Sequence, residues 1–259
     1  MDTLPNLTTK AMGHSLIHLE QVDSTNRYLK ENAHALPDLS VVLSDSQTQG
    51  KGRGDRSWSS APGDGLYMSL LLKDIHPQNL SRLPLVVAMG VRAGLETLCG
   101  AQFQIKWSND VLCEGKKLCG ILCESRIESG NTMAVIGIGV NLNQSRQALD
   151  RLGLVYASSL FLATNRHFSQ EETAGAICNA LEGIILKNSD SAALPALWEE
   201  YRRYCVTLGK RVKVTRDGRE VEGFAADIAD DGSLLCEIDG QIVPISAGEA
   251  TIRGMAGYA

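Results

Sequence analysis

A stretch in which glycines alternate with basic residues is the most unusual chemical feature of the sequence. It runs from Gln47 to Trp58 and reads QTQGKGRGDRSW. Glycine lets the backbone turn tightly and approach a ligand closely, and successive free N–H groups can form a concave anion-binding site. Lys51, Arg53 and Arg56 add positive charge, so the natural ligand is a phosphate or a carboxylate. The alternative is a flexible, solvated loop, because basic glycine-rich loops are common on protein surfaces.

The same stretch matches neither of the two common nucleotide-binding patterns. A Walker A loop needs GxxxxGK followed by Ser or Thr, and this order is absent from the stretch. The GxGxxG dinucleotide fingerprint fails because Asp55 stands where the third glycine would fall. The pattern therefore predicts an anion-binding loop of another kind.

Two short motifs farther along the chain place lysines beside polar groups. Residues 106–110 read KWSND after a strand-like run, so their polar side chains either face a ligand or simply form a turn. Residues 117–124 read KLCGILCE, in which Lys117 opens an apolar strand and Gly120 leaves room for a ligand. A lysine at the end of a strand is also a common edge charge, so this second interpretation stays open.

A third motif, VIGIGVNLN at residues 135–143, contains two glycines within a strand-like run. Glycines weaken a strand unless something packs closely against them. Asn141 and Asn143 either orient a nucleotide or a metal-bound water, or cap the end of the strand.

The elements that must position these groups are helices and strands in mixed order. Ser24 precedes a helix-like segment and can cap its first free N–H groups. Pro84 and Gly100 suit the first turn and the end of a longer helix. The pattern further predicts strands at 41–43, 66–72, 103–107, 117–124 and 132–141, a turn at 127–131, and helices at 169–187 and 191–205.

The residue pattern changes after Gly209, where three Asp-Gly pairs lie between short runs of residues typical of β-strands. Asp-Gly is a strong hairpin signal because glycine accepts positive φ and aspartate tolerates it. We therefore expect an α+β domain over residues 1–207 and a small β-barrel over residues 208–259. The three pairs are Asp217-Gly218, Asp231-Gly232 and Asp239-Gly240.

The composition is that of a globular protein with a sizeable core. The 259 residues are 44% hydrophobic and 21% charged, and the formal net charge is -5. This acidic balance disfavours general binding to nucleic acid or to anionic membranes. The N-terminus has no signal-peptide pattern, and the longest apolar runs are too short to cross a bilayer. The seven cysteines lack zinc-site spacing and are expected to be reduced thiols of a cytoplasmic protein.

Together and in this order, the motifs resemble the biotin protein ligase family. The triplet Ser24-Thr25-Asn26 resembles the family's biotin-ring contact, and the glycine-rich stretch resembles its GRGRxxRxW loop for biotin and the adenylate. The three later motifs resemble KWPND, KxxGILxE and GxGxN. Five motifs in register, spread over nearly the whole chain, are far more specific than any one of them.

A few substitutions depart from the family pattern. Lys51 stands where arginine is usual, which keeps the charge but loses the bidentate fork. Gly54 and Asp55 make the loop less positive than is usual. Ser108 replaces a proline, which is expected to loosen that turn. These changes concern affinities more than activity.

The resemblance implies a fold and a reaction. The fold is a mixed β-sheet with helices, similar to that of class II aminoacyl-tRNA synthetases, followed by a small SH3-like β-barrel. The reaction uses biotin, ATP and Mg²⁺ to form biotinyl-5'-AMP and then transfers biotin to a lysine of a biotin carboxyl carrier protein. We expect the ligase-only form, without an N-terminal DNA-binding domain, acting as a monomer or a homodimer.

The resemblance also assigns roles to side chains. Arg53 and Lys117, assisted by Lys51, are expected to bring the biotin carboxylate and the α-phosphate together. Asp110 is the candidate to orient the acceptor lysine and take its proton. Mg²⁺ is expected to bridge the phosphates, without a metal site made by the protein. The expected biotin contacts are Ser24, Thr25, Asn26, Gln47, Gly50, Lys51, Gly52, Arg53, Lys117 and Gly120. The expected ATP contacts are Lys51, Arg53, Arg56, Trp58, Asn109, Lys117 and Asn141.

Several alternatives stay open on the sequence. Trp58 forms an apolar wall for biotin or is plain core packing. A lipoate ligase or octanoyl transferase resembles the same fold, but the glycine-rich loop and the terminal β-domain favour biotin. A non-catalytic biotin sensor would keep the pocket without turnover, and the retained Arg53 and Lys117 argue against it.

Overall fold

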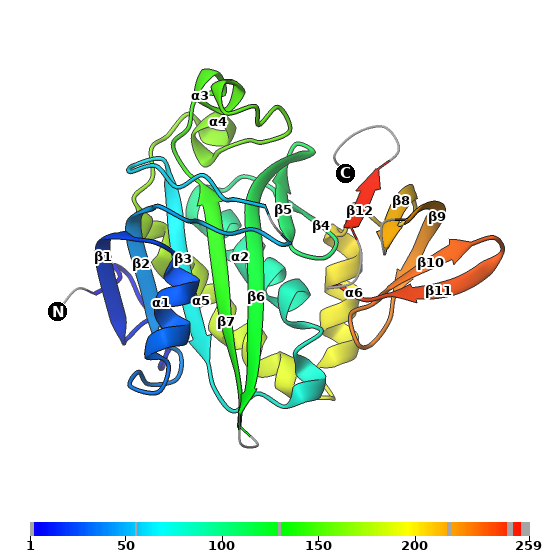
Figure 1. Cartoon of the computed structure of the whole chain (residues 1–259), viewed down its shortest axis with the longest axis horizontal. Coiled ribbons are helices and arrows are strands. Elements are labelled where there is room, and N and C mark those ends of the chain that lie inside the picture. The colour runs from blue at the N-terminus through cyan, green and yellow to red at the C-terminus, as the bar shows by residue number, and fades with distance from the viewer. Residues whose placement is uncertain (1–2, 55, 129–130, 217–218, 248–250, 255–259) are drawn as a thin grey trace.

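A computed structural model of the chain describes residues 3–54, 56–128, 131–216, 219–247 and 251–254. Two β-sheets organise these residues, and helices cover the larger sheet (Figure 1). Asp55, the Asp217-Gly218 pair and part of the turn expected at 127–131 lie outside the described residues.

The larger sheet has seven strands in the order β1-β2-β3-β7-β6-β5-β4. The β1–β2 pair is parallel and the other pairs are antiparallel, so the mixed sheet expected from the sequence is confirmed. The strands are β1 (Leu16–Val22), β2 (Val41–Gln47), β3 (Gly65–Leu72), β4 (Gln104–Lys106), β5 (Asp110–Cys113), β6 (Lys116–Glu128) and β7 (Asn131–Asn141).

Helices lie on both faces of this sheet. In Figure 1, α1 (Thr25–Asn32) covers one face, while α2 (Leu83–Cys99) and α5 (Gln170–Ser189) run behind the other. Ser24 caps α1 by accepting a hydrogen bond from Arg27 N, as its residue type predicts. The shorter helices are the 3-10 turn Pro77–Asn79, α3 (Arg146–Arg151), α4 (Leu160–Thr164) and α6 (Leu194–Tyr204).

The two helical layers explain why β3 is buried along its whole length. Side chains alternate between the faces of a strand, so a strand covered on both sides is apolar throughout. On the α1 face, Leu29 packs with Val42 and Leu71. On the other face, Leu70 and Leu181 belong to the main core with residues of α2.

The second sheet is antiparallel and has the order β11-β10-β9-β8-β12. Two of the predicted Asp-Gly turns are confirmed: Gly232 (φ 85°) lies between β9 and β10, and Asp239-Gly240 (φ 52° and 75°) joins β10 to β11. The predicted small all-β unit is thus present. Its strands are β8 (Arg211–Arg216), β9 (Arg219–Ile228), β10 (Leu234–Ile238), β11 (Gln241–Ile245) and β12 (Thr251–Gly254).

The seven cysteines are free thiols, five of them buried. Burial raises the pKa of Cys113 and Cys236 to about 11, so both stay protonated at neutral pH. None of the helices in the described part of the chain is long and apolar enough to cross a membrane.

The contact between α2 and α5 depends on Gly94. A Cβ at this position would lie 2.7 Å from Ala176 O and 2.8 Å from Ile177 Cα, both backbone atoms of α5. We expect Gly94→Ala to lower the free energy of unfolding by about 1–3 kcal/mol, because overpacking forces the helices apart. Gly183→Ala, in an open position of α5, should instead stabilise by about 0.5–1 kcal/mol. Urea unfolding of both variants and of the unchanged protein measures these free energies. A Gly94→Ala variant as stable as the unchanged protein would contradict the close packing.

Candidate active site

The glycine-rich stretch folds as a closed hairpin. Trp58 N donates to Gly50 O (2.8 Å), Gly52 N donates to Arg56 O (2.7 Å), and an isolated β-bridge pairs Lys51 with Ser57. Gly50 is needed because a Cβ there would lie 2.5 Å from Trp58 O. This pairing favours a defined hairpin over the alternative of a free surface loop.

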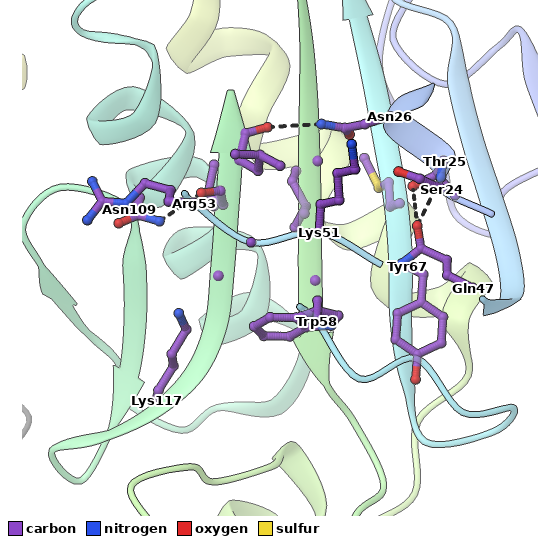
Figure 2. A pocket seen from close by; sticks show the side chains of 18 residues that line it. Ser24, Thr25, Asn26, Gln47, Lys51, Arg53, Trp58, Tyr67, Asn109 and Lys117 are labelled. Atoms are coloured by element: carbon purple, nitrogen blue, oxygen red, sulfur yellow. Dashed lines mark hydrogen bonds between the residues drawn. The ribbon is translucent and has the colours of Figure 1, made fainter. Parts of the chain in front are cut away.

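The hairpin lays the Trp58 indole across the strands of the sheet (Figure 2), against two strand glycines. Gly120 of β6 and Gly139 of β7 face each other in the strand register. A Cβ at Gly120 would lie 2.8 Å from indole Cζ3, and one at Gly139 would lie 2.5 Å from Cε2. Gly139 therefore has the close packing partner that its occurrence in a strand predicted, and Gly120, where room for a ligand was expected, lies against the same indole. Lys117 Nζ lies 5.5 Å from the ring centroid, within range of a cation–π contact.

Two adjoining cavities lie beside Trp58. The inner cavity extends from the start of α1 to the strand glycines, and the outer cavity extends from the hairpin to the segment after α3. Both cavities share Arg53, Trp58 and Lys117, which therefore lie where the two meet.

Every residue predicted to contact biotin or ATP lines one of these cavities. Nine of the expected biotin contacts line the inner cavity, and the tenth, Gly50, lines the outer one. Among the expected ATP contacts, Lys51 lines only the inner cavity, and Arg56 and Asn141 only the outer one. Asp110 also lines the outer cavity.

The inner cavity has a buried polar wall at the start of α1. The Thr25 backbone N–H and hydroxyl both donate to Gln47 Oε1, at 2.9 and 3.1 Å (Figure 2). Gln47 Nε2 donates to Ser60 Oγ at 2.9 Å. Ser24, Thr25 and Asn26 are all 2–4% exposed. Neutral, pre-organised donors and acceptors of this kind suit a neutral polar ligand.

The junction of the cavities is positively charged. Arg53 Nη1 donates to Ser108 Oγ (2.9 Å) and to Ala247 O (2.8 Å), which joins the hairpin to the loop after β11. Lys117 Nζ lies 2.7 Å from Asp110 Oδ1. Ser108, where the family pattern has proline, is fully buried and offers Arg53 a hydroxyl acceptor that proline lacks.

Two asparagines brace the cavity walls with backbone contacts. Asn109 Nδ2 donates to Ile121 O (2.8 Å), and the Ile121 N–H donates back to Asn109 O (2.9 Å). Asn141 Nδ2 donates to Ser158 O (2.9 Å), and Gln144 Nε2 donates to Asn141 Oδ1 (3.3 Å). For Asn141, these contacts favour the strand-capping interpretation beside its place in the outer cavity.

Some lining residues escaped the sequence analysis. Tyr67 and Met68 line the inner cavity from β3, which was predicted as a strand without any indication of which side chains face a ligand. Tyr67 OH donates to Ala61 O, and burial, followed by the charge of Asp64, raises the pKa of Tyr67. Leu154 lines the outer cavity although no motif marks it.

Comparisons with known proteins agree with this geometry. A model described as the biotin/lipoate A/B protein ligase family matches residues 18–141, and one described as the biotin protein ligase C-terminal domain matches residues 207–253. The bifunctional ligase/repressor BirA of Bacillus subtilis (strain 168) is 34% identical over 239 residues, covering 89% of this chain and 72% of that protein. The chain belongs to the biotin protein ligase family. This confirms the resemblance carried by the five motifs.

Further relatives of this ligase point the same way. The biotin–[acetyl-CoA-carboxylase] ligase of Mycobacterium tuberculosis is 31% identical over 237 residues, covering 88% of this chain and 85% of that protein. The solved biotin protein ligase of Aquifex aeolicus in complex with biotin and ATP is 28% identical, with a TM-score of 0.78 over 93% of this chain and 99% of that chain. The expected fold class and the expectation of a ligase enzyme are therefore confirmed.

The close seat of the Trp58 ring in this ligase can be tested by fluorescence. Gly139→Ala should push the indole off β7 toward solvent and shift its emission to longer wavelength, since the added Cβ has no room. Trp107 and Trp198 are buried elsewhere, so the same substitution in a Trp58→Phe background should leave the emission unchanged. Identical emission with and without Gly139→Ala in the Trp58-containing protein would refute the contact.

Proposed function

We propose that this ligase joins biotin to ATP as biotinyl-5'-AMP and then transfers biotin to a lysine of a biotin carboxyl carrier protein. The observation that carries the proposal is the position of Arg53 and Lys117, which line both cavities at their junction. Two anions that must react need cations where they meet. An inner cavity with a neutral polar wall, an outer cavity rich in glycine and polar groups, and cations where the two meet fit biotin, ATP and their reacting atoms.

Biotin would lie in the inner cavity with its ureido ring against the polar wall. Ser24, Thr25 and Gln47 carry the donors and acceptors that this group needs. Trp58 would then contact the apolar parts of the molecule, which places the valeryl carboxylate toward Arg53. ATP would occupy the outer cavity beside the hairpin.

The first step has to overcome the repulsion between two anions. A carboxylate oxygen of biotin attacks the α-phosphorus, the bond from that phosphorus to the bridging oxygen breaks, and pyrophosphate leaves. Arg53 and Lys117 offset the negative charge at this point, and Lys51 assists from the hairpin. Such cations act most strongly where water is excluded, and a tightly closed hairpin would also protect the mixed anhydride from hydrolysis.

Mg²⁺ would arrive with the phosphates of ATP and reduce their charge. Among the residues that the structure describes, no group of three or more His, Cys, Asp or Glu side chains is placed to hold a metal ion. Asp110 is the carboxylate that lines the outer cavity, and it pairs with Lys117. These residues fit an ion that keeps phosphate and water ligands, as Mg²⁺ does in most ATP sites.

The second step needs a neutral amine, which a lysine with a pKa near about 10.4 seldom supplies at neutral pH. Asp110 is buried beside the outer cavity and is our candidate to orient that amine and accept its proton. The amine nitrogen attacks the carbonyl carbon, the bond from that carbon to the AMP oxygen breaks, and AMP leaves. Lys117 has to turn from Asp110 toward the phosphate for Asp110 to act.

The proposal divides the chain into a catalytic part, residues 1–207, and a C-terminal part, residues 208–259. The second family model supports a boundary near this position, since its match begins at residue 207. The Arg53 contact with Ala247 suggests that the C-terminal part supports the hairpin. We place the reaction in the cytoplasm, where seven free thiols would stay reduced.

ATP–pyrophosphate exchange tests the substrate directly. The ligase is supplied separately with biotin, lipoate and octanoate, and we expect exchange with biotin alone. Exchange with lipoate or octanoate instead would move the chain to a related acyl ligase. If none of the three supports exchange, the protein would instead be a non-catalytic sensor of biotin.

Removing the Arg53 guanidinium should impair the first step. We expect Arg53→Ala to slow adenylate formation by about 10²-fold, the typical cost of losing one pre-organised donor at developing charge. The variant should also release biotinyl-5'-AMP faster, and single-turnover rates with radiolabelled biotin measure both effects. Arg53→Lys should lie between, since it keeps the charge without the fork.

Arg211→Ala is the control for Arg53→Ala. Arg211 is an exposed arginine of β8, outside both cavities, so its loss should change neither rate. An Arg53→Ala enzyme with normal adenylation and normal retention of the intermediate would remove Arg53 from the proposed mechanism.

A further inference from the structure

Behind the polar wall of the inner cavity lies a chain of buried hydrogen bonds. Asn26, in the first turn of α1, is 4% exposed, and Ser69 of β3 is fully buried. Ser69 Oγ lies 2.6 Å from Asn26 Oδ1 and 2.8 Å from Thr25 Oγ1. Asn26 Nδ2 lies 2.8 Å from Oε2 of Glu124, in β6. The chain thus connects three elements that are far apart in the sequence.

The orientation of the Asn26 amide follows from the chemistry of its neighbours. An ionised carboxylate can only accept hydrogen bonds, so the amide nitrogen has to face Glu124. The amide oxygen then faces Ser69 and takes its single hydroxyl proton. Gly137 packs against that oxygen with bare backbone, because a Cβ there would lie 2.5 Å from it. The amide is therefore held on both sides, and its oxygen and nitrogen can exchange places only if the amide group rotates by half a turn.

The Glu124 carboxylate is itself held by a lysine from α1. Lys30 Nζ lies 2.6 Å from Glu124 Oε1. Burial by itself raises the pKa of Glu124, but the hydrogen bonds from Lys30 and Asn26, together with the charges of Lys30 and Lys51, hold that pKa below its ordinary value. Glu124 is therefore ionised at neutral pH and acts only as an acceptor.

The other end of the chain reaches atoms that line the inner cavity. With the Ser69 proton given to Asn26, the Thr25 hydroxyl donates either to Ser69 or to Gln47 Oε1, 3.1 Å away. In both cases the Thr25 proton is used within the wall, and a lone pair stays available to a ligand N–H. Gln47 Oε1 also accepts the Thr25 backbone N–H, which leaves the Gln47 amide nitrogen as a donor.

We propose that Glu124, held by Lys30, is a positioning residue that sets the donor and acceptor pattern of the ureido-binding wall. The inference rests on the proposed biotin function and deepens it. An acceptor at Thr25 and a donor at Gln47 match the N–H and carbonyl groups of a cyclic urea. Without the carboxylate, only the longer contact with Leu122 O (3.4 Å) holds the Asn26 amide nitrogen in place, so the amide can flip. A flipped amide turns its nitrogen toward Ser69, whose proton is then given to Thr25 and occupies the lone pair that a ligand N–H would use.

Glu124→Gln keeps the shape of the side chain but offers Asn26 either an amide oxygen or an amide nitrogen. We expect KM for biotin to rise about tenfold, with kcat and KM for ATP changed less than about twofold. The kcat/KM ratio of biotin over 2-iminobiotin should fall, because the guanidinium of that analogue presents only donors. The ratio of biotin over desthiobiotin should stay the same, since desthiobiotin keeps the urea.

Two further variants make the test specific. Glu220→Gln is the matched control, because it breaks the 2.8 Å pair of Glu220 with Lys213 in the C-terminal sheet and should change none of these constants. Lys30→Met leaves every residue of the wall in place and should raise KM for biotin about threefold, with the same selectivity shift. This variant decides the matter if Glu124→Gln fails to fold.

An unchanged KM for biotin together with an unchanged iminobiotin ratio, in either variant, would overturn the inference. So would equal rises in KM for biotin and for ATP, which would indicate general disturbance of the site. Wild-type exchange with lipoate or octanoate in place of biotin would instead refute the proposed function, and the two failures are therefore distinguishable.

Discussion

The seat of the Trp58 indole on two strand glycines is the contact on which the rest of the site depends. The ring fits against the sheet because β6 and β7 carry no side chains at Gly120 and Gly139, which face each other in the register. With the ring in place, the backbone N–H of Trp58 donates to Gly50 O and closes the hairpin. Arg53 then lies beside both cavities. The glycines weaken their strands, and burial of the aromatic ring offsets that loss.

Charge is distributed along the site in a way that suits two successive tasks. The wall at Thr25 and Gln47 is neutral and hydrogen-bonded before any ligand arrives, so little has to be reorganised on binding. The cations stand farther out, where the cavities meet. Arg53 is tied to Ser108, between β4 and β5 of the larger sheet, and to Ala247, in the loop after β11, so both parts of the chain hold its charge in place.

Local signals in the sequence predicted most elements correctly. Ser24 caps a helix and Gly100 ends one in the left-handed region, because both effects depend on a few adjacent residues. The strand β1 was missed because three of its seven side chains are polar, and its pairing with β2 is distant in sequence. The turn that was left open for the KWSND motif is present at residues 107–109, and Asp110 begins β5 because β6 pairs with it.

The sequence by itself predicted the family, a mixed sheet followed by a small all-β unit, and the candidate residues for charge and ligand contact, since motif order and residue chemistry do not depend on coordinates. Only the tertiary structure decided which of them meet. It laid Trp58 on two glycines, put Ser108 under Arg53, and joined Asn26 through Ser69 and Glu124 into one hydrogen-bonded chain. Strand register and helix packing set these contacts, and both arise from long-range burial of apolar surface that no short motif encodes.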